Sequence, residues 1–187
     1  METFEKLEGR IVKCYKCSLA TTAKRKVPGS GNKKAHILFV GEAPGKKEDE
    51  TGEPFVGTSG KILNELLDSI SISRSEIFIA NIVKCRPPKN RDPSPSEIIL
   101  CKPWLLKQIS LIQPKVIVTL GRHSLKIFLG NDKNISECHG KNHTISFSKE
   151  IKAITIIPLY HPAATIYNKK LKKVLFEDFQ KLREFLS

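Results

Sequence analysis

Cysteines are the first residues in this sequence of 187 amino acids whose spacing could support chemistry. Cys14 and Cys17 form a CxxC pair, which lets two thiolates bind one metal centre, and Cys85 and Cys101 supply a second pair. A redox CxxC should sit between a strand and a helix, and the sequence before Cys14 does not have the pattern of a strand. Metal binding is therefore favoured over a redox pair or ordinary buried thiols, but the spacing does not separate zinc from iron–sulfur.

Polar and glycine-rich segments follow three apolar runs that have the pattern of buried strands. These segments are GEAPG (41–45), the stretch from Asn81 to Pro88, and HPAA (161–164). Ligands of a parallel sheet gather beyond the carboxyl ends of its strands. We therefore expect these three segments, although far apart in the sequence, to meet at one site.

The first segment and the residues after it offer a turn, carboxylates and an aromatic ring. Glycine and proline in GEAPG predict a tight turn with exposed backbone N–H groups, and Glu42 adds a carboxylate. The acidic run at 48–50 is either a solvated face or part of a pocket wall. Phe55 is either part of a small satellite core or a platform on which a flat ligand stacks.

Asn81 and His161 are the candidates beside later strands. Asn81 interrupts the apolar run IFIANIV, so its buried amide needs a partner, which is either the backbone or the edge of a ligand. His161 follows an apolar strand and precedes a proline. A histidine in such a place is more often structural than catalytic, yet His161 is the best placed of the five histidines for chemistry.

Alternating strands and helices predict the scaffold that must position these segments. The alternation predicts an α/β fold with a mainly parallel sheet covered on both faces. No repeat or linker divides the chain, so we expect one domain over residues 1–187. Strands are predicted over 36–41, 77–83, 115–121 and 153–160, with a further strand over 143–148.

Helices are predicted where apolar residues recur at helical spacing. The SPSE sequence at 94–97 is a capping box, and the helix that it opens should be kinked or interrupted at Pro103. The segment 41–60 is expected to be a loop. Helices are predicted over 4–12, 62–70, 94–112, 122–129 and 171–186.

Composition and charge limit the classes of protein. The 32 basic and 19 acidic residues give a net charge of +13, which modestly favours a nucleic-acid partner over a merely solvated basic surface. No apolar run reaches the roughly 20 residues of a membrane span. The N-terminus has no signal-peptide core. We therefore expect a cytoplasmic protein with no membrane association.

Four segments, taken together and in order, resemble a known family. They are GEAPGKKEDETGEPFVGTSG, NIVKCRPPKNRDPSPSEIILC, PKVIVTLG and YHPAA, and the resemblance runs from about Cys14 to Phe185. The chain is similar to the family-four uracil-DNA glycosylases, the thermostable iron–sulfur type. Glu42 fits family four, whereas family-five enzymes typically have leucine there.

The resemblance implies a fold and a cofactor. The implied fold is a three-layer α/β/α arrangement with a central four-stranded, mainly parallel sheet. The implied cofactor is a four-iron–four-sulfur cluster that packs the N-terminal helix and the CxxC segment onto the domain and leaves Cys138 free. Its ligands would be Cys14, Cys17, Cys85 and Cys101.

The resemblance also implies an activity, which is the hydrolytic removal of uracil from DNA to leave an abasic site. Phe55 would stack on the flipped base, and Asn81 would read the edge of uracil. Glu48 would lie near C5 and help to exclude the methyl group of thymine. Backbone groups of Gly41 to Ala43 would face the base.

Bond cleavage in such an enzyme produces a cationic sugar and a departing uracil anion. His161 would hydrogen-bond O2 of the leaving base, and Glu42 would stabilise the sugar or orient the attacking water. Glu42 could instead act through its backbone, with Glu48 sharing the electrostatic role. A lysine nucleophile is an alternative to water, but the resemblance implies a monofunctional, water-using enzyme.

The segment after HPAA departs from the family pattern. Many relatives continue with leucines and an arginine, whereas this chain has Ile166 and Tyr167 followed by lysines. Ile166 could wedge into the base stack, and Lys169 and Lys170 could hold phosphates of single- or double-stranded DNA. The lysines could equally be the solvated start of the last helix.

Other functions fit parts of the same pattern. A non-catalytic iron–sulfur module that binds nucleic acid could share the fold, although a binding module has no need of the complete set of polar residues. A structural zinc protein would explain the cysteines alone. A glycosylase of broader scope would act on hypoxanthine, xanthine or mismatched thymine as well as uracil. We expect the protein to act as a monomer.

Overall fold

The centre of the computed structural model, which describes residues 2–146 and 153–185, is one sheet of six strands. The strands are β1 Ser30–Gly31, β2 Ile37–Gly41, β3 Phe78–Asn81, β4 Val116–Leu120, β5 His143–Ile145 and β6 Ile154–Leu159. Their order across the sheet is β1-β3-β2-β4-β6-β5. The four central strands are parallel, and β1 and β5 pair antiparallel at the two edges.

The predicted parallel core is confirmed, but the expected number of four strands is wrong because the sheet has an additional strand at each edge. β1 has two residues and no apolar alternation, so the sequence carries no signal for it. The strand predicted over 143–148 is observed as the three residues of β5. Residues 147 and 148 lie outside the described part of the chain.

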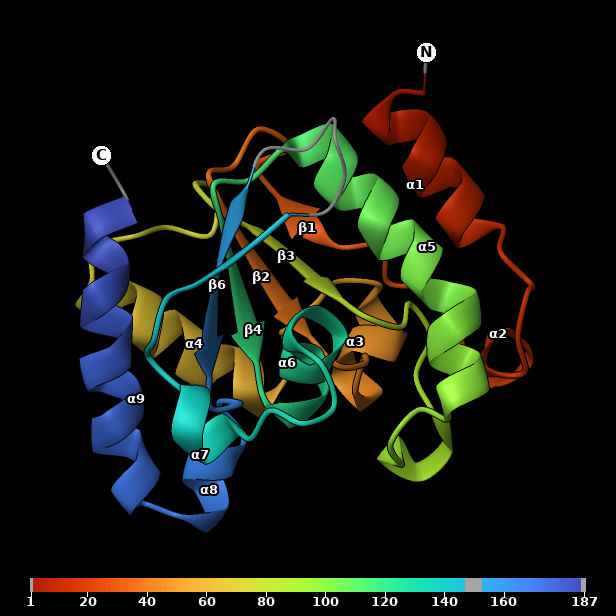
Figure 1. The fold of residues 1–187 in the computed structure, drawn as a ribbon. Helices are drawn as coiled ribbons and strands as arrows, with labels where there is room; N and C mark the ends of the chain where they lie inside the picture. The colour runs from red at the N-terminus through yellow and green to blue at the C-terminus, as the bar shows by residue number, and fades with distance from the viewer. Residues whose placement is uncertain (1, 147–152, 186–187) are drawn as a thin grey trace.

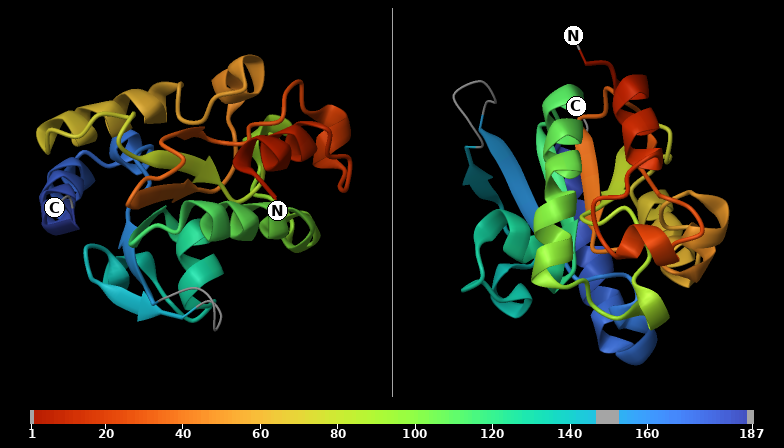
Figure 2. Two further views of the ribbon diagram at one scale, coloured as in Figure 1. Left: turned by 90° about the horizontal axis from the view of Figure 1, so that it is seen from above. Right: turned by 90° about the vertical axis from the view of Figure 1, so that its right-hand side faces the viewer.

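Helices cover both faces of the sheet, which confirms the three-layer α/β/α architecture (Figures 1 and 2). On one face α1 (Phe4–Val12), α5 (Pro95–Ile112) and α6 (Arg122–Leu129) share a core with alternate residues of β2. On the other face α4 (Thr58–Ser69) and α9 (Lys170–Gln180) pack against the remaining residues of β2. The shorter helices are α2 Leu19–Thr22, α3 Lys46–Thr51, α7 Ile135–Cys138, α8 Ala164–Tyr167, and the 3₁₀ helices Pro88–Asn90 and Lys181–Phe185.

The helix α5 begins as predicted but continues past its proline. Ser94 accepts from the backbone N–H of Glu97, Glu97 accepts from the backbone N–H of Ser94, and the capping box is confirmed. The predicted interruption at Pro103 is wrong, because α5 is one helix from Pro95 to Ile112, whereas a kink at this residue stays a prediction. The proline leaves the carbonyl of Ile99 without its helical donor, and Ile99 lies on the exposed side of the helix, where solvent can take that place.

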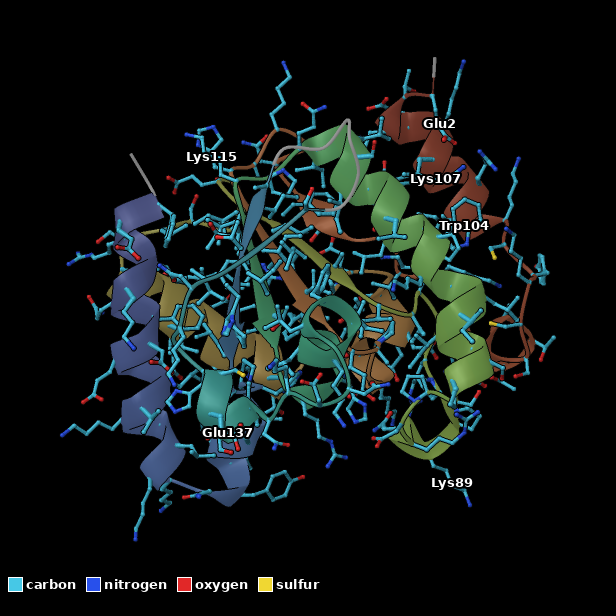
Figure 3. All side chains as sticks on the ribbon, in the orientation of Figure 1. Glu2, Lys89, Trp104, Lys107, Lys115 and Glu137 are labelled. Carbon is cyan, nitrogen blue, oxygen red and sulfur yellow. The ribbon has the colours of Figure 1, made fainter. Side chains whose placement is uncertain are left out.

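The helix α1 is held against α5 through Trp104, which is buried. Figure 3 shows Trp104 and Lys107 on α5, beside α1. Arg10 and Lys16 lie 5.3 Å and 4.8 Å from the centre of the indole ring, within the range of a cation–π contact. Lys107 lies over the same ring and pairs with Glu2 at 3.3 Å. These contacts join both ends of α1, and the CxxC segment that follows it, to Trp104 and Lys107 of α5.

The carboxyl ends of the parallel strands lie at one edge of the sheet. The register places Gly41 of β2 beside Asn81 of β3, and Thr119 of β4 between Val40 and Pro158. The segments that follow these strands lead into α3, α6 and α8, which lie around this edge in Figure 1. In the described ranges, none of the helices combines the length and apolarity needed to cross a bilayer.

Candidate functional site

A pocket of about 740 Å³ opens at this edge, and the segments predicted to meet do meet there. Its wall includes the GEAPG turn, the end of β3, the residues before α5, the start of α6 and the segment around α8. Six of the predicted site residues line it, namely Glu42, Ala43, Glu48, Phe55, Asn81 and His161. Gly41 lies behind the wall, because a Cβ atom at this position would collide with Asn81 Oδ1 and the ring of Phe55.

The amide of Asn81 is buried and has no hydrogen-bond partner among the described residues. Its side chain is 1% exposed, and neither Oδ1 nor Nδ2 forms a bond. Buried amides are normally satisfied, because leaving one unpaired costs about 1–3 kcal/mol per group. The sequence left two partners open for this amide, the backbone and the edge of a ligand. The amide does not bind the backbone, so it is free to bind the edge of a ligand in the pocket.

Phe55 is held in place by its backbone as well as by its ring. Its φ of 53° lies in the left-handed region, which a phenylalanine adopts only where the surroundings enforce it. Arg74 donates to the Phe55 carbonyl at 2.7 Å and to the Pro54 carbonyl at 2.6 Å. A Cβ atom on Gly60 would collide with the same carbonyl of Phe55. The ring lies 5.7 Å from that of His161, at an angle of 30°.

His161 is a neutral hydrogen-bond donor that faces the pocket. Its Nδ1 accepts from the backbone N–H of Ala163 at 3.1 Å, so the proton of the neutral ring is on Nε2. Burial lowers the pKa of His161 to about 4, against the opposing effect of the Glu48 carboxylate. At neutral pH the ring therefore offers an Nε2–H group without a positive charge.

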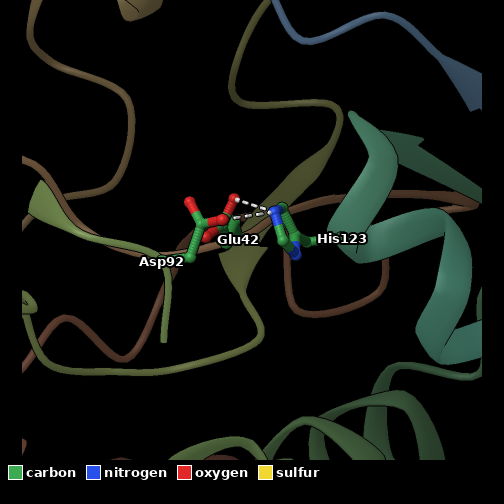
Figure 4. Close-up of side chains that lie close together, drawn as sticks. All are labelled: Glu42, Asp92 and His123. Atoms are coloured by element: carbon green, nitrogen blue, oxygen red, sulfur yellow. Dashed lines mark ion pairs between the residues drawn. The ribbon is translucent and has the colours of Figure 1, made fainter. Parts of the chain in front are cut away.

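Glu42 titrates near neutrality because of its surroundings. Burial raises the pKa of Glu42 to about 7, the carboxylate of Asp92 adds to this effect, and Arg122 opposes it. His123 Nε2 lies 3.8 Å from Glu42 Oε2 and 3.1 Å from Asp92 Oδ2 (Figure 4). Burial lowers the pKa of His123, so at neutral pH it does little to offset the repulsion between the two acids.

Sequence reasoning missed Asp92, Arg122 and His123. Arg122 bridges to Asp92 at 3.1 Å and, like Asp92, lines the pocket. Arg122 and His123 follow β4 at its carboxyl end. Ligands gather beyond the carboxyl ends of parallel strands, and this applies to the end of β4 as it does to the other three strands. The position of Arg122 and His123 directly after an apolar run is therefore the signal that identifies them.

The acidic run at 48–50 faces inward over its first two residues. Glu48 accepts from the backbone N–H groups of Gly45, Val56 and Gly57 at 2.9–3.1 Å, so its carboxylate ties the two ends of the pocket loop together. Asp49 accepts from the backbone N–H of Lys24 at 2.9 Å. The expectation of a loop over 41–60 is wrong in part, because α3 contains both acids and α4 begins within this segment.

The two predicted cysteine pairs pack into the same core beside α5. Cys85 and Cys101 belong to that core, and Cys14 and Cys17 pack against it. Burial raises the pKa of Cys85 to about 12, and the thiols of Cys101, Cys17 and Cys14 contribute to the same shift. The four thiols therefore lie near one another beside α5. Cys138 is buried in α7 and is not among the groups that shift the pKa of Cys85.

The predicted DNA-contacting residues are exposed beside the pocket. Ile166 is 48% exposed, and Tyr167 is 90% exposed and lines the pocket mouth. Lys169 and Lys170 follow on the exposed surface at the start of α9. An apolar side chain and two cations are thus exposed on the segment whose Tyr167 lines the pocket.

Comparison with known proteins agrees with this arrangement. Residues 28–185 match the model of the uracil DNA glycosylase superfamily. A type-4 uracil-DNA glycosylase of Sulfurisphaera tokodaii is 47% identical over 98% of the chain and 85% of its own length. The enzyme of the same name from Saccharolobus solfataricus is 46% identical over 100% of the chain and 88% of its length. The enzyme of the same name from Archaeoglobus fulgidus is 43% identical over 98% of the chain and 94% of its own length. The chain therefore belongs to the type-4 uracil-DNA glycosylases of the uracil DNA glycosylase superfamily.

Proposed function

We propose that this protein hydrolyses the N-glycosidic bond of uracil in DNA and leaves an abasic site, the first step of base excision repair. The observation that carries the proposal is the unpartnered amide of Asn81 in the pocket. Uracil presents an acceptor at O4 beside a donor at N3–H, which Asn81 Nδ2 and Oδ1 can satisfy together. Cytosine reverses both polarities, and a buried group left unpaired is a strong basis for rejecting a substrate.

The remaining pocket residues support the chemistry of bond cleavage. Phe55 supplies a flat face against the base, and the Nε2–H of His161 can stabilise the charge that develops on O2 as uracil leaves. Ionised Glu42 can stabilise the cationic sugar or orient water. Within residues 2–146 and 153–185 no lysine lines the pocket, which supports water over a lysine nucleophile. The exclusion of the thymine methyl group by Glu48 stays a prediction, because the hydrogen bonds of the Glu48 carboxylate are with backbone N–H groups of the loop.

Glu42 should set the pH dependence of the reaction. If ionised Glu42 is required, the single-turnover rate should rise about tenfold per pH unit below pH 7 and level off above it. Because Asp92 raises the pKa of Glu42, Asp92→Asn should move this rise to lower pH. Glu42→Gln should remove the rise and slow the reaction, while Asp132→Asn, an exposed acid outside the pocket, should leave the profile unchanged. If the pH profile of Asp92→Asn is identical to that of wild type, the ionisation of Glu42 is not the cause of the rise in rate.

The four cysteines would hold a four-iron–four-sulfur cluster. Four thiolates suit either this cluster or a single zinc ion, but in tetrahedral zinc sites with bonds of about 2.3 Å the sulfurs lie about 3.8 Å apart. Among the described residues, no three of these sulfurs lie within 4.8 Å of one another. The wider arrangement supports a cluster, which an anaerobic visible spectrum distinguishes from colourless zinc.

The cluster should act on stability rather than on chemistry, because hydrolysis needs no electron transfer. Cys17→Ala should cost several kcal/mol of folding free energy, and each kcal/mol lowers Tm by about 2–4 °C in a chain of this size. Binding of DNA should weaken before single-turnover chemistry does. Cys138→Ala is the matched control and should keep both the visible spectrum and Tm close to wild type. A fully stable Cys17→Ala protein with a selective loss of rate would instead indicate a catalytic cluster.

DNA containing uracil, single- or double-stranded, is the proposed partner of a monomeric protein. Ile166 is proposed to wedge beside the flipped nucleotide, and Lys169 and Lys170 to hold phosphates. The net charge of +13 supports binding to a polyanion.

A base-release assay tests the proposal directly. One labelled oligonucleotide with U, T or C at a single site, single-stranded or paired, is incubated with the protein and assayed for abasic sites. Release from the U site alone is the expected result. Release of hypoxanthine, xanthine or mismatched thymine would broaden the substrate class. Binding without release of any base would make the protein a non-catalytic nucleic-acid-binding module.

A further inference from the structure

Lys84 is a buried cation between the pocket and the cysteine site. It lies three residues after Asn81 and directly before Cys85, and it is 2% exposed. Its Nζ donates to the backbone carbonyl of Asn81 at 2.8 Å and to Gln108 Oε1 at 2.7 Å. Its backbone N–H donates to Cys101 Sγ at 3.3 Å. One residue therefore contacts the main chain of the base-reading strand, the helix α5 and a cysteine thiol.

The contacts of Lys84 continue into the surrounding framework. Gln108, which is fully buried, donates through Nε2 to the carbonyl of Pro28 at 2.8 Å. The carbonyl of Lys84 accepts from the backbone N–H of Val27 at 2.7 Å. Burying an ammonium is costly unless its hydrogen bonds are satisfied. None of the ion pairs in the described part of the chain involves Lys84, so the two hydrogen bonds of its Nζ are the contacts that offset the cost of its burial.

The carbonyl of Asn81 can influence the pocket because no hydrogen bond within the described residues holds the Asn81 side chain, which is kept in place by packing alone. Both amide atoms lack protein partners, so their direction depends on the backbone of Asn81. Asn81 is the last residue of β3, and the N–H of the peptide that follows it, that of Ile82, donates to the Gly41 carbonyl at 3.0 Å. The bond from Lys84 is the second anchor of this peptide, and it holds the carbonyl side at the position from which the amide projects.

We propose that Lys84 is a positioning residue, which aims the Asn81 amide and links it to the four-cysteine site. Its side chain holds the Asn81 carbonyl, and its backbone holds Cys101. The inference rests on the proposed role of Asn81 as the reader of uracil. It assigns the short sequence between Asn81 and Cys85 a function in base recognition that does not require contact with the base.

Lys84→Met tests this inference, because methionine has a similar length and no donor. Loss of a hydrogen bond to a charged group should weaken the binding of free uracil, measured by calorimetry on the cluster-loaded protein, by about 10- to 100-fold. The single-turnover rate should fall and the preference for uracil over cytosine should narrow. The visible spectrum of the cluster and the affinity for undamaged DNA should stay near wild type. Ile109→Ala on α5, next to Gln108, is the matched control and should leave uracil binding unchanged at comparable loss of stability.

A double-mutant cycle separates positioning from general weakening of the fold. If Lys84 acts through the Asn81 amide, Lys84→Met should cause no further loss of rate in a protein that already carries Asn81→Ala. Any effect of Ile109→Ala on the rate should be the same with and without Asn81→Ala. Should Lys84→Met not fold, Gln108→Leu, which removes one partner of the ammonium, should weaken uracil binding several-fold and show the same non-additivity. Additive effects, or wild-type uracil binding by these variants, would overturn the inference. Normal uracil binding by Asn81→Asp would show that the proposed role of Asn81 is wrong. Failure of the Lys84 inference alone would leave the defect of Asn81→Asp in place, so the two outcomes are distinguishable.

Discussion

His161→Ala is expected to slow the release of uracil by about 10²–10³-fold, the usual cost of removing one well-aimed donor to a developing anion. The contact from Nε2–H to O2 strengthens as the glycosidic bond breaks, so its loss should act on the rate more than on binding. Affinity for DNA should change far less, because phosphate contacts supply most of it. The imidazole is neutral above its pKa of about 4, so the defect should be the same from pH 6 to pH 9.

Single-turnover release at saturating DNA, beside a binding titration at fixed salt, is the measurement for His161→Ala. His36→Ala is a suitable control because His36 is exposed and directly precedes β2, at the opposite edge of the sheet from the pocket. This control should match wild type in both measurements. Unchanged release by His161→Ala would remove the residue from the mechanism. Equal losses of rate and affinity would make it a residue that positions the substrate.

The place of the pocket could be predicted from the sequence because parallel strands have a strong signature. Every residue of β2 and β4 is buried, and such strands appear as continuous apolar runs. Once these runs are found, the segments after them must share one edge. Glu42, Asn81 and His161 were found in this way, and all three line the pocket.

The sequence did not reveal features that depend on tertiary packing. The direction of Glu48 follows from backbone N–H groups eight and nine residues away, which no local pattern encodes. The repulsion between Glu42 and Asp92 depends on the approach of residues 50 positions apart. The helix α5 tolerates Pro103 because buried neighbours such as Leu105 and Ile109 hold it in place. Short edge strands such as β1 form because a neighbouring strand offers unpaired backbone groups, not because of their own residues.

Asn81→Asp is expected to abolish most uracil release at neutral and alkaline pH. An ionised carboxylate only accepts hydrogen bonds, so it would lose the donor to O4 and repel that oxygen. The loss should reach about 10⁴-fold, the range in which a site built for one hydrogen-bonding pattern rejects another. Asn32→Asp, an exposed amide in the loop before β2, is the control and should not affect release.

The pH dependence of Asn81→Asp makes this test specific to the polarity of the amide. Burial raises the pKa of a carboxyl group while the nearby Lys84 ammonium opposes this rise, and the introduced acid should take up a proton as pH falls. Its protonated form offers one donor and one acceptor, as asparagine does. Both proteins slow at low pH because Glu42 is protonated in both. The ratio of the variant's rate to the wild-type rate should nevertheless recover toward low pH, and cytosine should become a better ligand only at high pH. Release at the wild-type rate across this range would show that Asn81 does not read the base.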